Sequence, residues 1–248
     1  MPKFFIEQEN IKDNKIIITG ENVNHIKNVL RKRIQDTLEI CNSQTKENFL
    51  CEIEQFRNEE IICSIIEKMQ KSVEPKTYIN IYQGLPKSDK MELIIQKAVE
   101  LGVSEITPTN MTRCIVKLEG KDEKKKIERW QKISEVAAKQ SGRDIIPTIN
   151  NICTLKEIAN QCKDYDAILL AYENEKENTL KNEIQKLKNT QKENLKIAVI
   201  IGPEGGLAAE EVEKAKQQGI SIITLGDRIL RTETVALNVL SIIMYELG

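Results

Sequence analysis

The chain has 248 residues, of which 40% are hydrophobic and 30% are charged, and its formal net charge is −1. Only 11 residues are glycine and 6 are proline, so the composition excludes disordered and collagen-like chains. The balanced charge argues against a basic nucleic-acid arm, and phosphate contacts would have to come from local clusters. The longest apolar runs, such as Ile168–Tyr172 and Ile197–Ile201, are too short to span a membrane, and MPKFFIEQEN lacks the apolar segment of a signal peptide. We therefore expect a soluble, cytoplasmic protein.

The cysteines and the histidine restrict the chemistry. Six cysteines are scattered without a C-x-x-C pair, which predicts reduced thiols in a chain of this size, and His25 is the single histidine. Zinc sites need clustered Cys or His ligands, and Ser–His–Asp catalysis needs a histidine base. We expect no metal and no chemistry driven by imidazole.

The first 70 residues have a β-like pattern. Short apolar or alternating runs predict strands at FFIE, KIIITG, DTLEIC, FLCEIE and EIICSII. One helix is expected from about Asn22 to Arg33, with Val23, Ile26, Val29 and Leu30 on one face. Short strands around one helix predict a small barrel or sandwich over residues 1–70, followed by the polar linker QKSVEPK.

After Pro75 the pattern alternates between strands and helices. Strands are expected at TYINIYQG, SEITPTN, IIPTI, DAILLAY, KIAVIIG and ISIITLG. Helices are expected at Ser88–Leu101, Glu123–Ser141, Leu155–Cys162, Ala208–Gln218 and at the C-terminal end. A further, charged helix is expected to end at about Leu187. Gly102, Gly142 and Gly219 stand where helices commonly end. This alternation predicts an α/β domain over residues 75–248, with helices covering a parallel sheet.

The segment KIAVIIGPEGGL places a glycine-rich loop directly after a buried strand. Glycines allow backbone to approach a ligand closely, and open α/β sheets bind ligands at the carboxyl ends of their strands. Neither G-x-x-x-x-G-K-[ST] nor G-x-G-x-x-G occurs, and Glu204 within the loop would repel phosphate. The loop favours an uncharged or cationic ligand, although an ordinary strand–helix turn also fits this segment alone.

The segment ISIITLGDRILRTETVALNVL repeats the strand–loop–helix plan. Gly226 ends the strand, and Thr232 is expected to cap the following helix. Between them, Arg228 and Arg231 flank an apolar pair, Ile229 and Leu230. An exposed apolar pair in a loop indicates a pocket for a flat, uncharged ring.

Together these segments resemble the SPOUT class of RNA methyltransferases, and most closely the RsmE family, which methylates N3 of a uridine in small-subunit (16S) ribosomal RNA. The matching stretches are QKAVELGV (96–103), ITPTNMTR (106–113), Trp130 with QSGR (140–143), IGPEGGL (201–207) and LGDRILRTET (225–234). His25–Arg31 followed by Asp36–Ile40 resembles the family's PUA-like RNA-binding barrel. Leu207 and Val235 depart from the family pattern by apolar exchanges.

The resemblance implies a PUA-like β-barrel at 1–70 and a SPOUT methyltransferase domain at 75–248 with a C-terminal trefoil knot. It also implies S-adenosyl-L-methionine as cofactor, a homodimer, and 16S rRNA or the small ribosomal subunit as partner, without membrane or metal. The implied cofactor-binding residues are Ile201, Gly202, Pro203, Glu204, Gly205, Gly206, Leu225, Gly226, Ile229, Leu230, Arg231, Thr232 and Thr234.

The catalytic roles follow from the chemistry of methyl transfer to an imide nitrogen, and the RNA contacts are placed on clustered basic residues, partly in the barrel that resembles PUA. An arginine beside a uracil carbonyl would stabilise the developing anion, and the candidates are Arg231, Arg143 and Arg113, in that order. Glu233 or Glu204 would accept the proton or orient a loop. RNA contacts are expected at Lys27, Arg31, Lys32, Arg33, Lys87 and Lys90.

Three other functions compete with this interpretation. A plain nucleotide-binding α/β enzyme is weakened by the missing glycine fingerprints. A non-catalytic RNA-binding protein needs neither GPEGG nor LRTET. A SPOUT methyltransferase acting on transfer RNA stays open, although the N-terminal barrel and QSGR favour the RsmE interpretation.

Overall fold

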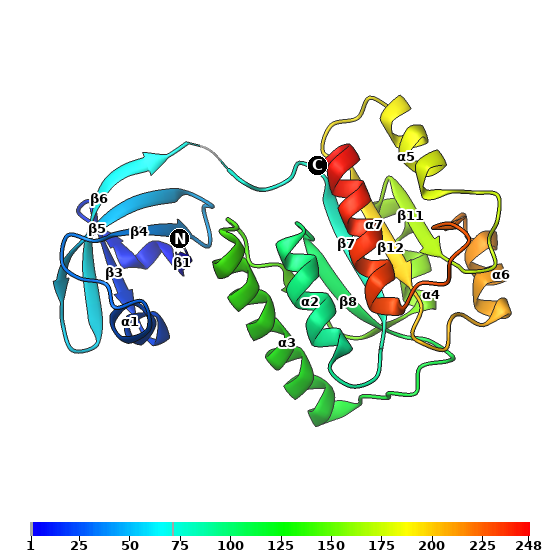
Figure 1. The fold of residues 1–248 in the computed structure, drawn as a ribbon, viewed down its shortest axis with the longest axis horizontal. Helices are drawn as coiled ribbons and strands as arrows, with labels where there is room; N and C mark the ends of the chain where they lie inside the picture. Colours follow the sequence, from blue (N-terminus) through cyan, green and yellow to red (C-terminus); the bar gives the residue numbers. More distant parts are fainter. Residues whose placement is uncertain (1, 71) are drawn as a thin grey trace. The chain divides into compact units, whose positions relative to one another are not determined.

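The computed structural model describes residues 2–70 and 72–248 (Figure 1). The chain divides into two compact units, Met1–Glu74 with Ala138–Ile146, and Pro75–Ala137 with Pro147–Gly248. Residues 138–146 therefore pack with the first unit, although the sequence pattern groups them with the stretch 75–248. Buried ion pairs hold this segment: Lys3 with Asp144, both at most 4% exposed, and Glu74 with Arg143.

The first unit contains a six-stranded curled sheet with strand order β1-β4-β5-β6-β3-β2. Neighbouring strands are antiparallel except β1 and β4, which are parallel. The strands are β1 Lys3–Ile6, β2 Ile11–Lys12, β3 Lys15–Thr19, β4 Thr37–Asn42, β5 Asn48–Phe56 and β6 Glu60–Met69, and a 3₁₀ turn, η1, covers Gln8–Asn10. Alternate residues of these strands, among them Phe4, Ile16, Ile40 and Ile53, form the unit's apolar core. The five strands predicted here are confirmed.

The helix of this unit is shorter than predicted. It consists of α1, Glu21–Asn24, and a π-helical segment η2, His25–Val29. It ends before Arg31, whose φ of 52° is left-handed and incompatible with a continuing helix. Because a π-helix has more residues per turn, the i, i+4 spacing no longer keeps Val29 on the buried face, and Val29 is 65% exposed. The predicted extension to Arg33 and the burial of Val29 are wrong.

The second unit is built on a parallel sheet of seven strands. Its order is β10-β8-β7-β12-β11-β13, with β9 paired to β8. The strands are β7 Tyr78–Gly84, β8 Glu105–Asn110, β9 Thr148–Ile149, β10 Cys153–Thr154, β11 Ala167–Ala171, β12 Lys196–Ile201 and β13 Ser221–Ile223. The central strands β12 and β11 are continuously apolar and almost fully buried, as a parallel sheet covered on both faces requires.

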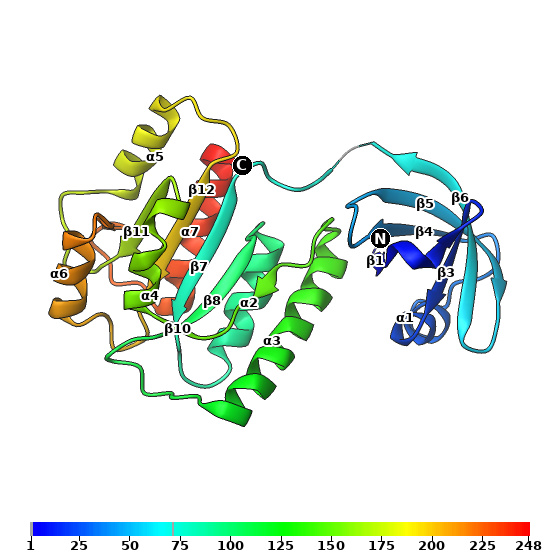
Figure 2. The same ribbon diagram turned by 180° about the vertical axis from the view of Figure 1, so that it is seen from behind.

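Helices connect these strands on both faces of the sheet. The helices are α2 Lys90–Glu100, α3 Gly120–Ser141, α4 Leu155–Asn160, α5 Leu180–Asn189, α6 Ala209–Gln217 and α7 Thr232–Leu247, and the 3₁₀ turn η3 covers Cys162–Asp164. Helices α2 and α7 lie side by side on one face, and α4 covers the other (Figures 1 and 2). The predicted α/β fold is confirmed, and Gly102, Gly142 and Gly219 adopt positive φ where helices end.

Two local predictions need correction. The strand expected at IIPTI shrinks to β9, because Ile145 and its neighbours bond to Glu74 instead of to a strand. Thr232 is the first residue of α7 rather than its cap, and Arg231 occupies the capping position. The Thr232 hydroxyl is used elsewhere, in the loop contact described below.

All six cysteines are free, as predicted. Burial raises the pKa of the Cys51 and Cys63 thiols to about 12 and that of Cys41 to about 11. Within residues 2–70 and 72–248, no helix is long and apolar enough to cross a membrane. The same residues contain no group of three or more His, Cys, Asp or Glu side chains placed to hold a metal ion.

Candidate active site

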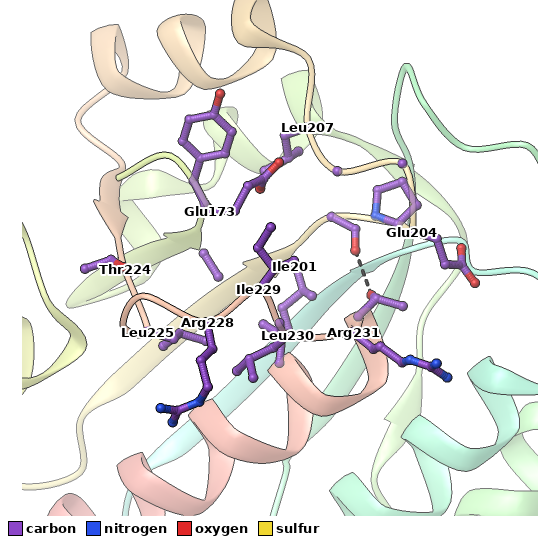
Figure 3. A pocket seen from close by; sticks show the side chains of 18 of the residues that line it. Glu173, Ile201, Glu204, Leu207, Thr224, Leu225, Arg228, Ile229, Leu230 and Arg231 are labelled. Carbon is purple, nitrogen blue, oxygen red and sulfur yellow. Dashed lines mark hydrogen bonds between the residues drawn. The ribbon is translucent and has the colours of Figure 1, made fainter. Parts of the chain in front are cut away.

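A cavity of about 470 Å³ lies where β11, β12 and β13 end (Figure 3). Its walls are the segments 171–173, 201–207 and 224–232, together with Lys90 and Val235. The volume lies in the range of about 300–1,000 Å³ typical of small-molecule sites. Parallel strands bring these three loops to one edge of the sheet, which explains why segments distant in sequence form one site.

The GPEGG loop forms one wall and is packed too tightly for most side chains. A Cβ on Gly202 would lie 3.2 Å from Cγ of Leu207, and one on Gly205 would lie 3.1 Å from Cβ of Arg113. Gly206 has a φ of 67°, and its N–H donates to the carbonyl of Pro203 at 2.9 Å, which closes the turn. These glycines keep the loop backbone at the cavity surface.

The loop before α7 forms the opposite wall and offers unpaired backbone. Within the described chain, the N–H groups of residues 227–230 have no hydrogen-bond partner. Ile229 is 85% exposed, and Leu225 and Leu230 lie beside it in the cavity. Apolar side chains with free backbone donors and acceptors suit a flat heterocycle that is recognised by its polar edge.

Thr232 ties the two walls together. Its hydroxyl donates to the carbonyl of Gly202 at 2.7 Å, which is the dashed line in Figure 3. The same hydroxyl accepts a hydrogen bond from Nε2 of Gln83 at 2.8 Å. Gln83 is fully buried on β7, and Thr232 is 5% exposed. The start of α7 is therefore anchored to the GPEGG loop through a buried hydroxyl.

A charge cluster occupies the rim near α2. The Lys90 ammonium lies 3.1 Å from Oε1 of Glu204 and 3.3 Å from Oε2 of Glu233. These carboxylates raise the pKa of Lys90. Burial alone would raise the pKa of Glu204, but hydrogen bonds from backbone N–H groups and from Lys90 lower it, so Glu204 is a carboxylate. Lys90, expected to contact RNA, instead balances two acids from the two loops.

The three candidate catalytic arginines lie in different surroundings. Arg231 is exposed and lines the cavity. Arg113 donates from Nη1 to the carbonyl of Gly205 at 3.0 Å and so supports the GPEGG loop. Arg143 is 5% exposed, belongs to the first unit and pairs with Glu74. The structure brings Arg231 and Arg113 to the two loops that line the cavity, whereas Arg143 is in a buried ion pair.

Of the thirteen residues expected to bind cofactor, twelve line the cavity, and Thr234 does not. The sequence interpretation missed Lys90 as a cavity residue and also missed the segment 171–173. The position of that segment after the apolar strand AILLA was the available signal. Among the expected RNA contacts, Lys27, Arg31, Arg33 and Lys87 are exposed, and Lys32 bonds to the carbonyl of Thr37.

Comparisons with known proteins identify the class. Residues 72–244 match the RNA methyltransferase domain family, and residues 18–66 match the RNA methyltransferase PUA domain. A crystal structure of a ribosomal RNA small subunit methyltransferase E from Neisseria gonorrhoeae, bound to S-adenosyl methionine, superposes with a TM-score of 0.84 at 27% identity, covering 99% of this chain and 97% of that one. The fold and site thus define an RNA methyltransferase of the SPOUT class with a PUA domain.

Two relatives specify the family. The ribosomal RNA small subunit methyltransferase E of Bacillus subtilis (strain 168) is 36% identical over 249 residues, covering 99% of this chain and 97% of that protein. The protein of the same name from Mesomycoplasma hyopneumoniae (strain 232) is 36% identical over 241 residues, covering 97% and 98%. The chain therefore belongs to the ribosomal RNA small subunit methyltransferase E family, which confirms the resemblance found in the sequence.

Proposed function

We propose that this protein transfers the methyl group of S-adenosyl-L-methionine to N3 of a uridine in small-subunit ribosomal RNA. The observation that carries this proposal is the cavity between the GPEGG loop and residues 224–232, in a chain of this family. The bound cofactor supplies a methyl group on a positively charged sulfur, which is already a strong electrophile. The protein has to bind the cofactor and the RNA, align the methyl group with N3 of the uridine, and favour the deprotonated form of the imide.

The cofactor would occupy the cavity with its adenine against the apolar wall. Unpaired backbone groups at 227–230 suit the polar edge of adenine, and Leu225, Ile229 and Leu230 suit its faces. The remaining cavity residues expected to bind it are Ile201, Gly202, Pro203, Glu204, Gly205, Gly206, Gly226, Arg231 and Thr232.

Arg231 is the residue to which we assign stabilisation of the uracil anion. It is exposed at the cavity, at the capping position of α7, and within the described residues its guanidinium pairs with no carboxylate. Glu233 follows two residues later, and its Oε2 lies 3.3 Å from the Lys90 ammonium. We keep Glu233 as a candidate to accept the proton or to orient the loop. Alignment of the reactants alone contributes about 7–11 kcal/mol to such reactions, and N3 is reached only when the base is unpaired or flipped out.

RNA contacts of the first unit are assigned to the basic cluster Lys27, Arg31 and Arg33, which is exposed on and after the π-helical segment. We assign a homodimer as the working state from the resemblance to the family, and the exposed Tyr245 of α7 and Leu93 of α2 are candidates for its interface. Location in the cytoplasm, where ribosomal RNA is processed, follows from this function. The knot implied by the family resemblance is part of the proposal.

Calorimetry tests cofactor binding, because the protein should bind S-adenosylhomocysteine with one site per chain. Nucleoside mass spectrometry of RNA from a deletion strain tests the methylation of small-subunit rRNA. We expect 3-methyluridine to disappear from small-subunit rRNA and to return with the wild-type gene. Loss of a methylated nucleoside from transfer RNA instead would support the transfer RNA alternative, and unchanged RNA would support a non-catalytic binder.

The role of Arg231 has its own test. Arg231→Ala should lower turnover at saturating S-adenosyl-L-methionine about 100-fold or more, a larger loss than its effect on the binding of S-adenosylhomocysteine. Arg228→Ala is the matched control, because Arg228 also lines the cavity and carries no assigned catalytic role. Near-normal turnover of Arg231→Ala would eliminate this assignment.

A further inference from the structure

Glu173 has no role in the function proposed above, yet its side chain lines the cavity. It follows β11, and Figure 3 shows it close to Leu207 at the cavity edge. Within residues 2–70 and 72–248, its carboxylate takes part in no hydrogen bond or ion pair. The ammonium of Lys176 donates to the backbone carbonyl of Glu173 and not to its carboxylate. The carboxylate is therefore free to accept hydrogen bonds from a ligand.

The carboxylate lies against the GPEGG loop. A Cβ on Gly206 would lie 2.8 Å from Oε1 of Glu173, so a side chain at this position would displace the carboxylate. The backbone of Gly206 also needs a positive φ, so glycine serves both the turn and the space for the carboxylate. Glu173 is thus placed over the backbone that borders the ligand space.

The other charges of the cavity indicate which ligand group meets Glu173. Lys90 is balanced by Glu204 and Glu233, whereas Arg228 and Arg231 have no acidic partner among the described residues. The amino-acid end of S-adenosylmethionine carries a carboxylate and an ammonium. Figure 3 shows the two free arginines, which attract that carboxylate, on the opposite side of the cavity from Glu173. The ribose carries no charge and has two adjacent hydroxyls that donate hydrogen bonds.

We propose that Glu173 recognises the ribose of the cofactor by accepting hydrogen bonds from its 2′- and 3′-hydroxyls. Acidic side chains use the same chemistry on ribose hydroxyls in dinucleotide sites. The inference rests on the proposed function, because it assumes that an adenosyl compound occupies the cavity. It makes Glu173 the specificity-determining residue that distinguishes ribonucleosides from deoxynucleosides.

Calorimetry with three ligands tests the proposal on the full-length wild-type protein and on Glu173→Ala. The ligands are S-adenosylhomocysteine, 5′-methylthioadenosine, which lacks the amino-acid end, and the 5′-methylthioadenosine analogue without the two ribose hydroxyls. Glu173→Ala should weaken the first two by about 10-fold to 100-fold, as expected for hydrogen bonds to a charged group. The variant and the wild type should bind the third ligand equally well. Glu177→Ala, an exposed glutamate in the same loop that does not line the cavity, should bind all three like the wild type.

Each other result overturns the inference. Weakening of S-adenosylhomocysteine alone would assign Glu173 to the amino-acid end. Equal weakening of all three ligands would show a merely structural role. Unchanged binding of all three would show that Glu173 does not contact the ligand. Failure of the wild-type protein to bind S-adenosylhomocysteine would refute the proposed function itself, so the two failures are distinguishable.

Discussion

Replacing Thr232 by valine removes the hydroxyl that joins α7 to the GPEGG loop while keeping the shape of the side chain. The hydroxyl makes two hydrogen bonds, to the Gly202 carbonyl and from Gln83, at a position that is 5% exposed. Each such bond contributes about 0.5–1.5 kcal/mol net, so we expect Thr232→Val to destabilise the protein by about 1–3 kcal/mol. The loss of stability should be near the upper end of this range, because the Gly202 carbonyl and the Gln83 amide remain buried after losing this hydrogen-bond partner.

Urea unfolding measures the effect as a lower midpoint with an unchanged slope. With a slope of about 3 kcal/mol per M, a loss of 2 kcal/mol lowers the midpoint by about 0.7 M. Ser241→Ala is the control, because it removes an exposed hydroxyl from the same helix and should change stability by at most about 0.5 kcal/mol. Binding of S-adenosylhomocysteine should weaken in Thr232→Val and stay unchanged in the control. A Thr232→Val protein with the wild-type midpoint would refute the anchoring role.

Three further predictions concern the loops, acid stability and RNA. Gly206→Ala should weaken binding of S-adenosylhomocysteine in calorimetry, because alanine is strained at the positive φ of this turn and its Cβ would displace the Glu173 carboxylate. Gly219→Ala, also at positive φ but with open space around it, should lose stability only. Burial alone would raise the pKa of Asp144, but hydrogen bonds from Lys3, Ser72 and Val73 lower it. Its contribution is therefore fully present above about pH 4, the pKa of an unfolded aspartate, and is lost as the pH falls through the lowered value. In unfolding experiments, the difference in stability between Asp144→Asn and the wild type should be largest near pH 7 and should begin to shrink only below about pH 4. Arg33→Ala should reduce the slope of log K against log salt for rRNA binding by about 0.7–0.9, and an unchanged slope would exclude a phosphate contact.

The hydrophobic pattern was sufficient to predict the fold because strand and helix periods are local properties. The sequences of β11 and β12 alone indicate buried central strands, and the prediction that a helix ends at Gly219 is correct. The π-helical turn at His25–Val29 was not predictable from the period, since the same residues also fit an α-helix. The position of residues 138–146 depends on ion pairs with Lys3 and Glu74, which are distant in the sequence.

The site was predicted where sequence motifs carry backbone geometry, as in GPEGG, and missed where side chains meet across loops. Lys90 reads as an exposed basic residue, and only the fold reveals its two carboxylate partners. Arg143 reads as a free arginine, but Glu74 pairs with it. Glu173 belongs to no motif, and its position at the cavity depends on a contact with Gly206, which lies more than thirty residues further along the chain.

The order in which the cavity walls occur along the chain has a consequence for biosynthesis. The wall formed by 224–232 is anchored by α7, which packs on α2. Near the far end of α7, the carbonyl of Leu247 accepts a hydrogen bond from the hydroxyl of Thr77. A nascent chain that has exposed GPEGG but still holds residues 225–247 in the ribosome lacks that wall. The growing polypeptide should therefore acquire affinity for nucleoside ligands only after this late segment has emerged and docked.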